Sequence, residues 1–178
     1  MKKNIEKLKP KQETQMNESS PIQDIDGVMK KISSKNEGFV TVSLTQILEN
    51  GIWQMEAEFS NSHNIATIGI VRDTYNITED THPYSNPHCN HMVSYGTGVQ
   101  EWGDAAIVCK GNVTKGNIAY YNNQKIKAEF DSEKGTLIFS VDGVQQPVYV
   151  RGINEKVRFF KLQTPTTKHV ANEIAVQW

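Results

Sequence analysis

The amino-acid sequence predicts an all-β protein, a sandwich or a barrel of about ten short strands. From Gly38 onward, apolar and polar residues alternate with a period of two in one short segment after another, which is the spacing of a half-buried β-strand. Turn-forming residues such as Gly, Asn, Asp and Ser separate these segments at intervals of about 8–12 residues. Over the same stretch, the apolar spacing of an amphipathic helix is almost missing.

The charged residues divide the chain into a tail and a body. The chain has 178 residues, which suits one domain preceded by a tail. Residues 1–35 contain eight lysines and five acidic residues, a formal charge of +3. Residues 36–178 contain eleven Lys and Arg and fifteen Asp and Glu, a formal charge of −4. We expect 1–35 to be a disordered basic tail and 36–178 to be the sandwich.

A short amphipathic helix is predicted at residues 20–32, within the tail. Ser20 suits an N-cap, Pro21 the first helical position and Gln23 the third position of a capping box. The apolar side chains that follow share one helical face: Ile22, Ile25, Val28, Met29 and Ile32. We expect this helix to dock on the body.

The strands are expected in order from residue 39 to the end of the sequence. In segment 53–59, Trp53, Met55, Ala57 and Phe59 alternate with Gln and Glu, so one face of the strand is apolar and the other is wet. Gly69, within the apolar run 65–71, indicates a bulge or a close backbone approach. Further strands are expected at 39–44, 92–96, 105–110, 117–121, 125–131, 136–142, 147–150, 157–163 and 170–178.

Residues 125–143 predict an antiparallel hairpin with one apolar face. Ile126, Ala128 and Phe130 alternate with polar residues before the turn, and Leu137, Phe139 and Val141 do so after it. Gly135 stands where a tight turn needs a positive φ, and the Asp-Gly pair at 142–143 begins a second turn. By contrast, residues 72–92 form a long polar loop with two prolines and three histidines. Long ordered loops on β scaffolds are often functional.

Three segments resemble the SPRY domain family, the sandwich module of butyrophilin and TRIM proteins. Residues 51–56, GIWQME, are similar to its early strand, in which a glycine precedes an aromatic pair and a Glu. Residues 68–70, IGI, are similar to its next strand. Residues 130–143, FDSEKGTLIFSVDG, resemble its most recognisable hairpin, with Asp142 where the family usually has Asn.

The resemblance implies two antiparallel sheets packed as a bent sandwich of the concanavalin-like jelly-roll type. It also implies a non-catalytic module without a cofactor that binds a protein or peptide through loops at one rim. We expect the rim to be formed by the loop 72–91, the segment around residue 102 and the turn 142–147. Exposed aromatic and Arg side chains are favoured at such surfaces. The residues expected to bind are Arg72, Tyr75, Tyr84, Tyr95, Trp102 and Gln145.

A zinc site in the polar loop is a competing hypothesis. His82, His88, Cys89 and His91 offer nitrogen and sulfur ligands within ten positions, and zinc takes four such ligands. The spacing meets the usual zinc patterns only loosely.

Two further hypotheses concern binding of another kind. One is a lectin-like domain that stacks a glycan on Trp102 or Tyr84, and the other is self-association through an edge strand. A carboxylate pair of the glycosidase type could come from Glu56 and Glu58. These two residues are better explained as the wet face of a half-buried strand.

The composition indicates which cellular compartment and which classes of binding partner to expect. The opening residues lack the apolar core of a secretory leader, and no apolar run reaches the roughly 20 residues that span a bilayer. Two cysteines, Cys89 and Cys109, fit a reducing compartment better than a disulfide framework. We therefore expect a cytoplasmic or nuclear protein that does not bind membranes. Nucleic acid is disfavoured as a partner, because phosphate binding needs an excess of Lys and Arg.

Overall fold

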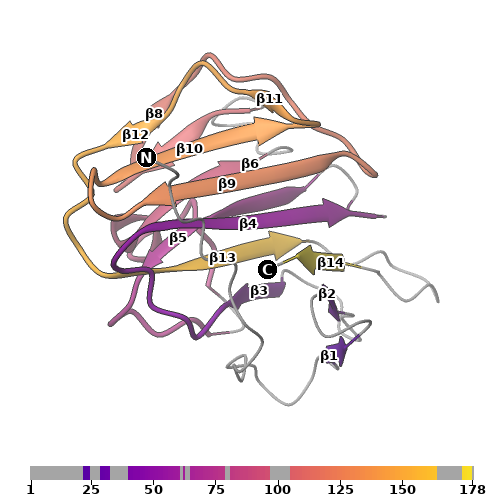
Figure 1. Ribbon diagram of the computed structural model, residues 1–178, viewed down its shortest axis with the longest axis horizontal. Coiled ribbons are helices and arrows are strands. Elements are labelled where there is room, and N and C mark those ends of the chain that lie inside the picture. The colour runs from indigo at the N-terminus through magenta and orange to yellow at the C-terminus, as the bar shows by residue number, and fades with distance from the viewer. Residues whose placement is uncertain are drawn as a thin grey trace, which may run out of the picture.

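The protein is an all-β sandwich of two antiparallel sheets (Figure 1). The structure is a computed structural model that describes residues 22–24, 29–32, 40–60, 62, 65–78, 81–96, 105–163 and 174–177. The all-β fold predicted from period-two alternation and the two antiparallel sheets implied by the resemblance are confirmed. Within the described part of the chain, no helix has the length and apolarity needed to cross a membrane.

Sheet A carries both halves of the predicted hairpin near one edge. Its strands lie in the order β1 (Ile22–Asp24), β2 (Met29–Ile32), β14 (Ile174–Gln177), β4 (Ile52–Phe59), β9 (Lys125–Asp131), β10 (Thr136–Val141) and β11 (Val144–Gln145), and β12 (Val150–Arg151) also pairs with β10. In the hairpin, Phe130 lies opposite Leu137 and Ala128 opposite Phe139. This is the register that puts the apolar residues of both strands on one face.

Sheet B faces sheet A across the core. Its strands lie in the order β3 (Val40–Ser43), β13 (Val157–Gln163), β5 (Ala66–Arg72), β6 (Met92–Gly96), β7 (Ile107–Cys109) and β8 (Asn112–Thr114). One short 3-10 helix, η1 (His88–His91), precedes β6. The inner faces of the two sheets form one continuous apolar core. Its largest fully buried side chains include Phe59, Phe130, Phe139, Phe159, Tyr95 and Tyr120.

The long polar loop covers the outer face of sheet B. Tyr75 and Ile77 pack there against a second apolar cluster formed by Val71, Met92 and Phe160. Thr41 Oγ1 donates a hydrogen bond to the carbonyl oxygen of Thr81, which anchors the loop to β3. Because sheet B is covered on both faces, every residue of β13 is buried.

The helix predicted at residues 20–32 is wrong. The described residues of this segment form β1 and β2, which pair antiparallel with Ile22 opposite Ile32. β2 also pairs with β14, and sheet pairing of this kind outweighs a weak local helical propensity. Of the disordered tail expected at residues 1–35, residues 1–21, 25–28 and 33–35 lie outside the described residues.

Residues 117–121 do not form the strand that the sequence predicts. The described strand in this region is β8, at Asn112–Thr114. Beyond it, side chains bind the backbone in place of a strand ladder: Ile118 N donates to Gln146 Oε1 at 2.9 Å, and Val148 N donates to Asn117 Oδ1 at 2.8 Å. Side-chain partners of this kind compete with ladder hydrogen bonds.

Candidate functional site

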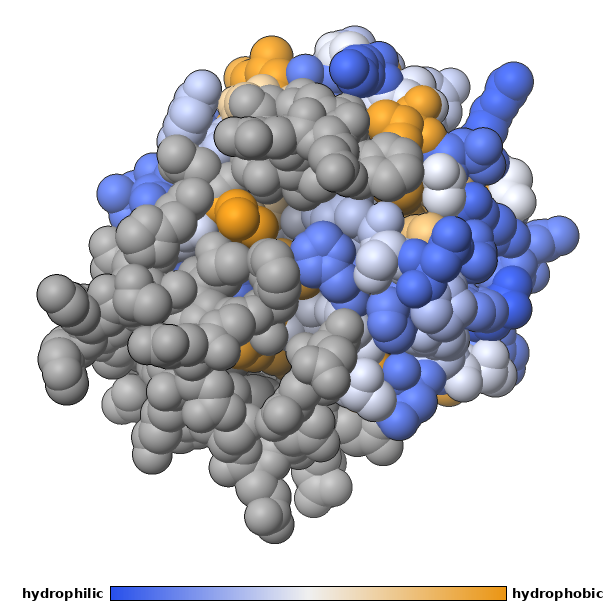
Figure 2. Space-filling model, turned by 180° about the vertical axis from the view of Figure 1, so that it is seen from behind, coloured by the Kyte–Doolittle hydropathy of each residue, from blue (hydrophilic) through white to orange (hydrophobic). Residues whose placement is uncertain are grey.

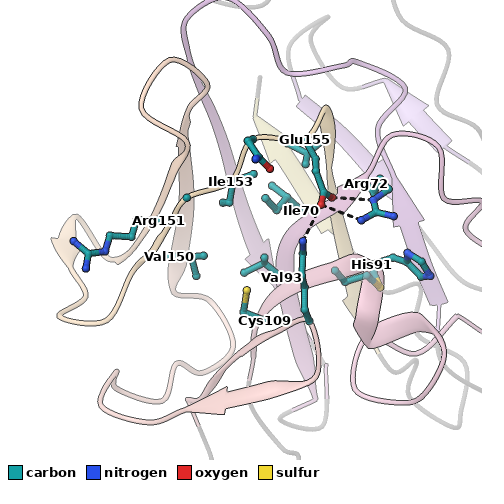
Figure 3. A pocket seen from close by; sticks show the side chains of 14 residues that line it. Ile70, Arg72, His91, Val93, Cys109, Val150, Arg151, Ile153 and Glu155 are labelled. Carbon is teal, nitrogen blue, oxygen red and sulfur yellow. Dashed lines mark hydrogen bonds and ion pairs between the residues drawn. The ribbon is translucent and has the colours of Figure 1, made fainter.

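A pocket of about 230 Å³ opens between the two sheets at one end of the sandwich (Figure 3). We call it the rim pocket. Apolar side chains from both sheets line its interior: Ile70 from β5, Val93 from β6, Val157 from β13, Val150 from β12 and Ile153 from the loop after β12. Ile70, Val93 and Val157 belong to the core, so the rim pocket is a place where solvent reaches the apolar interior.

Three charged side chains stand at the solvent side of the rim pocket. Arg72 contacts Glu155 through two hydrogen bonds, from Nε at 2.8 Å and from Nη2 at 2.9 Å, and Lys110 Nζ donates to Glu155 Oε1 at 2.8 Å. We call Arg72, Lys110 and Glu155 the charge cluster. Figure 3 shows these interactions as dashed lines beside the apolar lining. Two cations and one anion give the cluster a formal charge of +1.

The charge cluster keeps its carboxylate ionised. The hydrogen bond from Arg72, followed by that from Lys110, lowers the pKa of Glu155 to about 2. Glu155 in turn raises the pKa of Arg72. The bidentate Arg–carboxylate geometry fixes the planes of both groups. The cluster is therefore a rigid set of charges over a neutral pocket.

The turn of the predicted hairpin positions one wall of the rim pocket. Asp131 Oδ1 accepts hydrogen bonds from the backbone N–H groups of Glu133 and Lys134, which closes the turn. Gly135 has a φ of 60°, and its carbonyl oxygen accepts a hydrogen bond from Ile153 N at 3.0 Å. A Cβ at position 135 would overlap the carbonyl oxygen of Ile153. Only glycine therefore lets the loop after β12 lie so close to this turn.

A tyrosine–histidine cluster adjoins the rim pocket. His91 lines the pocket and stacks on Tyr75, with ring centroids 4.3 Å apart. The Tyr75 hydroxyl lies 2.6 Å from His88 Nδ1, and burial raises the pKa of Tyr75. On its other side, Tyr75 borders a second hollow of about 350 Å³ that also contains Arg158. Tyr75 therefore lines the second hollow and contacts a residue of the rim pocket.

The histidine loop is held by contacts within the protein. Cys89 Sγ lies 3.4 Å from Asn86 Oδ1, and burial lowers the pKa of His82, whose ring packs against Tyr84. Among the described residues, no group of three or more His, Cys, Asp or Glu side chains is placed to hold a metal ion. The zinc hypothesis for residues 82–91 therefore receives no support from the geometry of the loop.

The structure brings together only part of the predicted binding set. Arg72 lines the rim pocket and Tyr75 lies beside it. Tyr84 and Tyr95 belong to the interior, which corrects the expectation that they offer exposed rings. Tyr84 is 6% exposed, with its hydroxyl 2.7 Å from Thr67 Oγ1. Tyr95 is fully buried, and its hydroxyl donates to the carbonyl oxygen of Ile118.

Buried rings cannot stack on a ligand, so the structure removes Tyr84 as a platform for a glycan. Trp102, the other ring named for that role, lies outside the described residues. Its part in binding stays a prediction.

Gln145 does not line the rim pocket. It is exposed in β11, which pairs with the Ser140–Val141 end of β10. The pocket residue Val150 pairs with Leu137, near the opposite end of β10. The two paired positions on β10, Leu137 and Ser140, are three residues apart, which is about 10 Å along the strand. The predicted rim therefore divides into two separate surfaces.

Exposed apolar side chains lie on the segments before and after β11. The large apolar side chains that are exposed in the described part of the chain lie on the loop after β8 and on the segment 144–149: Ile118, Tyr121, Val144 and Tyr149. Figure 2 shows separate hydrophobic patches among hydrophilic residues near the upper edge of the molecule, on the side where Figure 1 draws β8, β11 and β12.

Sequence patterns did not predict the other members of the rim pocket. Lys110 and Glu155 are charged residues in turns, which is their usual place, and their meeting with Arg72 depends on the pairing of distant strands. The sequence around Val150 and Ile153 has the pattern of an ordinary edge strand followed by a loop. No local signal in the sequence distinguishes these four residues.

Comparison with solved structures identifies the fold. The chain is similar to the SPRY domain of human HERC1 at 11% identity and a TM-score of 0.61, over 90% of this chain and 93% of that domain. It is similar to the TRIM65 PSpry domain at 12% identity and a TM-score of 0.61, over 90% and 85% of the two chains. Stonustoxin matches at 13% identity and a TM-score of 0.54, over 88% of this chain and 26% of the toxin chain. No family model and no curated protein matches the sequence.

The sandwich is thus SPRY-like, in agreement with the resemblance of the 130–143 hairpin. At identities this low, the similarity establishes the fold alone and does not extend to function.

Proposed function

We propose that this SPRY-like sandwich is a non-catalytic protein-binding module that takes a peptide segment of its partner into the rim pocket. The observation that carries the proposal is the pocket itself: an apolar hollow that reaches the core, beside charges already fixed by hydrogen bonds. Concave, mostly apolar sites with a few well-placed polar groups are the usual form of a binding site.

Three titratable groups of the pocket are poorly suited to acid–base or nucleophilic catalysis. Acid–base catalysis needs a group whose pKa lies near the working pH. Here the pKa of Glu155 is lowered to about 2, that of Arg72 is raised, and burial raises the pKa of Cys109. A thiol with a raised pKa stays protonated and is a weak nucleophile. These three groups are therefore suited to fixed charge and packing.

We also propose that the partner belongs to the cytoplasm or nucleus and is neither nucleic acid nor membrane. Cys89 and Cys109 are both free thiols, which suits a reducing compartment. The formal charge of −4 on residues 36–178 disfavours phosphate backbones and anionic lipid surfaces.

Selection from a displayed library of random peptides of about a dozen residues would test the proposal. We expect the wild-type protein to enrich peptides that no longer bind Val150→Trp, because an indole at this position fills the rim pocket. The matched control is Val144→Trp, which places the same group on the exposed strand β11 at the far end of β10. Both variants would first be checked for a wild-type thermal transition.

A second measurement uses the thiol in the pocket and needs no substitution. Cys109 lines the rim pocket and is half-buried, whereas Cys89 is buried. A bound peptide should slow the alkylation of Cys109, followed by mass spectrometry at mildly alkaline pH. Peptides that bind Val150→Trp as well as wild type and leave Cys109 unprotected would refute the rim pocket as the site. So would a selection that enriches no peptide.

A further inference from the structure

We propose that the peptide recognised by the rim pocket carries an aliphatic or single-ring side chain next to an aspartate or glutamate. This inference rests on the proposed function and specifies its ligand. The apolar side chain would enter the pocket, and the neighbouring carboxylate would bind the charge cluster.

The size and lining of the pocket select the apolar side chain. An apolar cavity of about 150 Å³ is large enough to bind benzene, and the rim pocket measures about 230 Å³. It therefore has room for one large aliphatic or one single-ring side chain. Its walls are the side chains of Ile70, Val93, Val150, Ile153 and Val157, which offer such a group dispersion contacts and no polar partner.

The unused donors of the charge cluster select the carboxylate. A guanidinium has five N–H donors and an ammonium has three. Among the described contacts, Glu155 takes two donors of Arg72 and one of Lys110. Both cations therefore keep free donors at the solvent side of the pocket. Because Glu155 already holds them in place, a ligand carboxylate would bind them with little further loss of side-chain entropy.

The local charge selects an acidic ligand over a basic one. The charge cluster is +1, whereas residues 36–178 as a whole carry −4. A basic side chain next to the pocket would be repelled by the two cations of the cluster. The single carboxylate there already accepts hydrogen bonds from both of them. Arg151 also lines the rim pocket and adds a further positive charge to its surroundings, although its side chain points away from the other labelled residues in Figure 3.

The test uses one peptide that was enriched by the wild-type protein, synthesised in three forms. The first keeps its apolar–acidic pair, the second has Asn or Gln in place of the acid, and the third has Ala in place of the apolar residue. We expect each change to weaken binding about tenfold or more in a fluorescence polarisation assay. The amide form loses a hydrogen bond to a charged group, and the Ala form loses buried apolar surface, and each loss contributes about that much. Raising the salt from about 0.05 to 0.5 M should weaken the acidic form more than the amide form.

Protein variants identify the residues that read the carboxylate. Lys110→Gln and Arg72→Gln should weaken the acidic peptide about tenfold and make the acidic and amide peptides bind alike. Lys125→Gln removes the same charge from an exposed side chain of β9 that does not line the rim pocket, and we expect it to bind both peptides as the wild type does. Unchanged thermal transitions for Lys110→Gln would separate lost recognition from lost folding.

The outcomes separate this inference from the proposed function. Enriched peptides that lose binding to Val150→Trp, protect Cys109 and yet bind equally as acid and amide would overturn the acidic ligand while leaving the peptide-binding function in place. If Lys125→Gln weakened binding of the acidic peptide as much as Lys110→Gln does, the role of the charge cluster would be overturned.

Discussion

Lys161 lies inside the sandwich, where a lysine is rarely found. It pairs with Val42 on β3 and with Ile68 on β5, both members of the core, so its side chain shares their inner face. Lys161 is 3% exposed, and its Nζ has no hydrogen-bond partner among the described residues. Burial lowers the pKa of this amine well below its usual value. An unpaired buried amine should therefore reduce the stability of the fold.

Replacing Lys161 with Met should raise the free energy of unfolding at neutral pH by about 1–3 kcal/mol. Methionine keeps the length of the side chain and removes its polar atom. In the wild type, the unfolded chain holds a proton that the folded chain lacks between the lowered pKa and about 10.4. Wild-type stability should therefore rise with pH through this window, and the advantage of the variant should shrink.

Urea denaturation at several pH values would measure this difference, with Lys125→Met as a control on the surface. An equal or lower stability of Lys161→Met at neutral pH would mean that the amine is stabilised in the folded protein.

Glu155 shows the opposite pH dependence. Its pKa is about 2 in the folded protein, compared with about 4.3 in an unfolded chain. It therefore contributes stability that is complete above about pH 4.3 and is lost as the pH falls towards 2. Glu155→Gln should cost about 1 kcal/mol at neutral pH, since these groups are partly exposed and solvent screens them.

Acid titration of the unfolding free energy would check this expectation. The curves of wild type and Glu155→Gln should converge near pH 2, whereas Glu133→Gln, an exposed acid in the hairpin turn, should follow the wild type throughout. A constant gap between wild type and Glu155→Gln down to low pH would show that the ion pairs do not stabilise the fold.

At the scale of elements, the loop 73–91 is part of the structural frame of sheet B. Gly96 makes its docking possible, because a Cβ at this position would overlap Tyr84 Oη and Thr67 Oγ1. Gly96→Ala should therefore push the loop away and destabilise the protein by about 1–3 kcal/mol. Limited proteolysis and hydrogen exchange should detect the change within residues 73–91.

A matched double variant tests this explanation of Gly96. Tyr84→Phe removes the hydroxyl that the new methyl group would meet, so adding it to Gly96→Ala should recover part of the lost stability. Purely additive losses in the double variant would argue against a steric clash with Tyr84.

The turn between β9 and β10 links the hairpin to the rim pocket. Gly135 has a φ of 60° and lies against Ile153, whereas Gly143 has a φ of 80° and has open space around it. Gly143→Ala should cost about 1 kcal/mol from backbone strain alone. Gly135→Ala should cost more, and it should also weaken peptide binding, because it displaces the loop that carries Ile153 and Glu155.

Thermal unfolding and peptide binding measured on the two variants would distinguish these effects. If Gly135→Ala lost stability but bound the selected peptide as tightly as Gly143→Ala does, the turn would not position the pocket.

For the whole molecule, the position of the rim pocket couples binding to folding. The pocket takes its lining from both sheets, so a ligand in it bridges the two layers and is released when either layer unfolds. A peptide present at about 100 times its Kd should stabilise the protein by about 2.7 kcal/mol and raise its Tm accordingly. Val150→Trp should show no such shift with the same peptide. A shift of equal size in Val150→Trp would place the peptide elsewhere.

Much of the fold follows from local sequence patterns. Alternation in residues 53–59 and 126–141 determines which side chains enter the core, because the period of a strand is two and a slip of one residue would expose Phe130 and Leu137. Asp142 and Gly143 both adopt positive φ in the tight turn that their sequence predicts. These features depend on neighbours along the chain, and so the sequence by itself determined the sandwich and its hairpin.

The binding site was decided by tertiary structure. Arg72, Lys110 and Glu155 meet because β5, the turn after β7 and the loop before β13 converge at one end of the molecule. Tyr84 and Tyr95 became core residues because the two faces of sheet B are both covered. The strands β1 and β2 replaced a helix because a sheet edge was available to pair with. Contacts between residues far apart in sequence are set by strand order and layer packing, which local patterns do not encode.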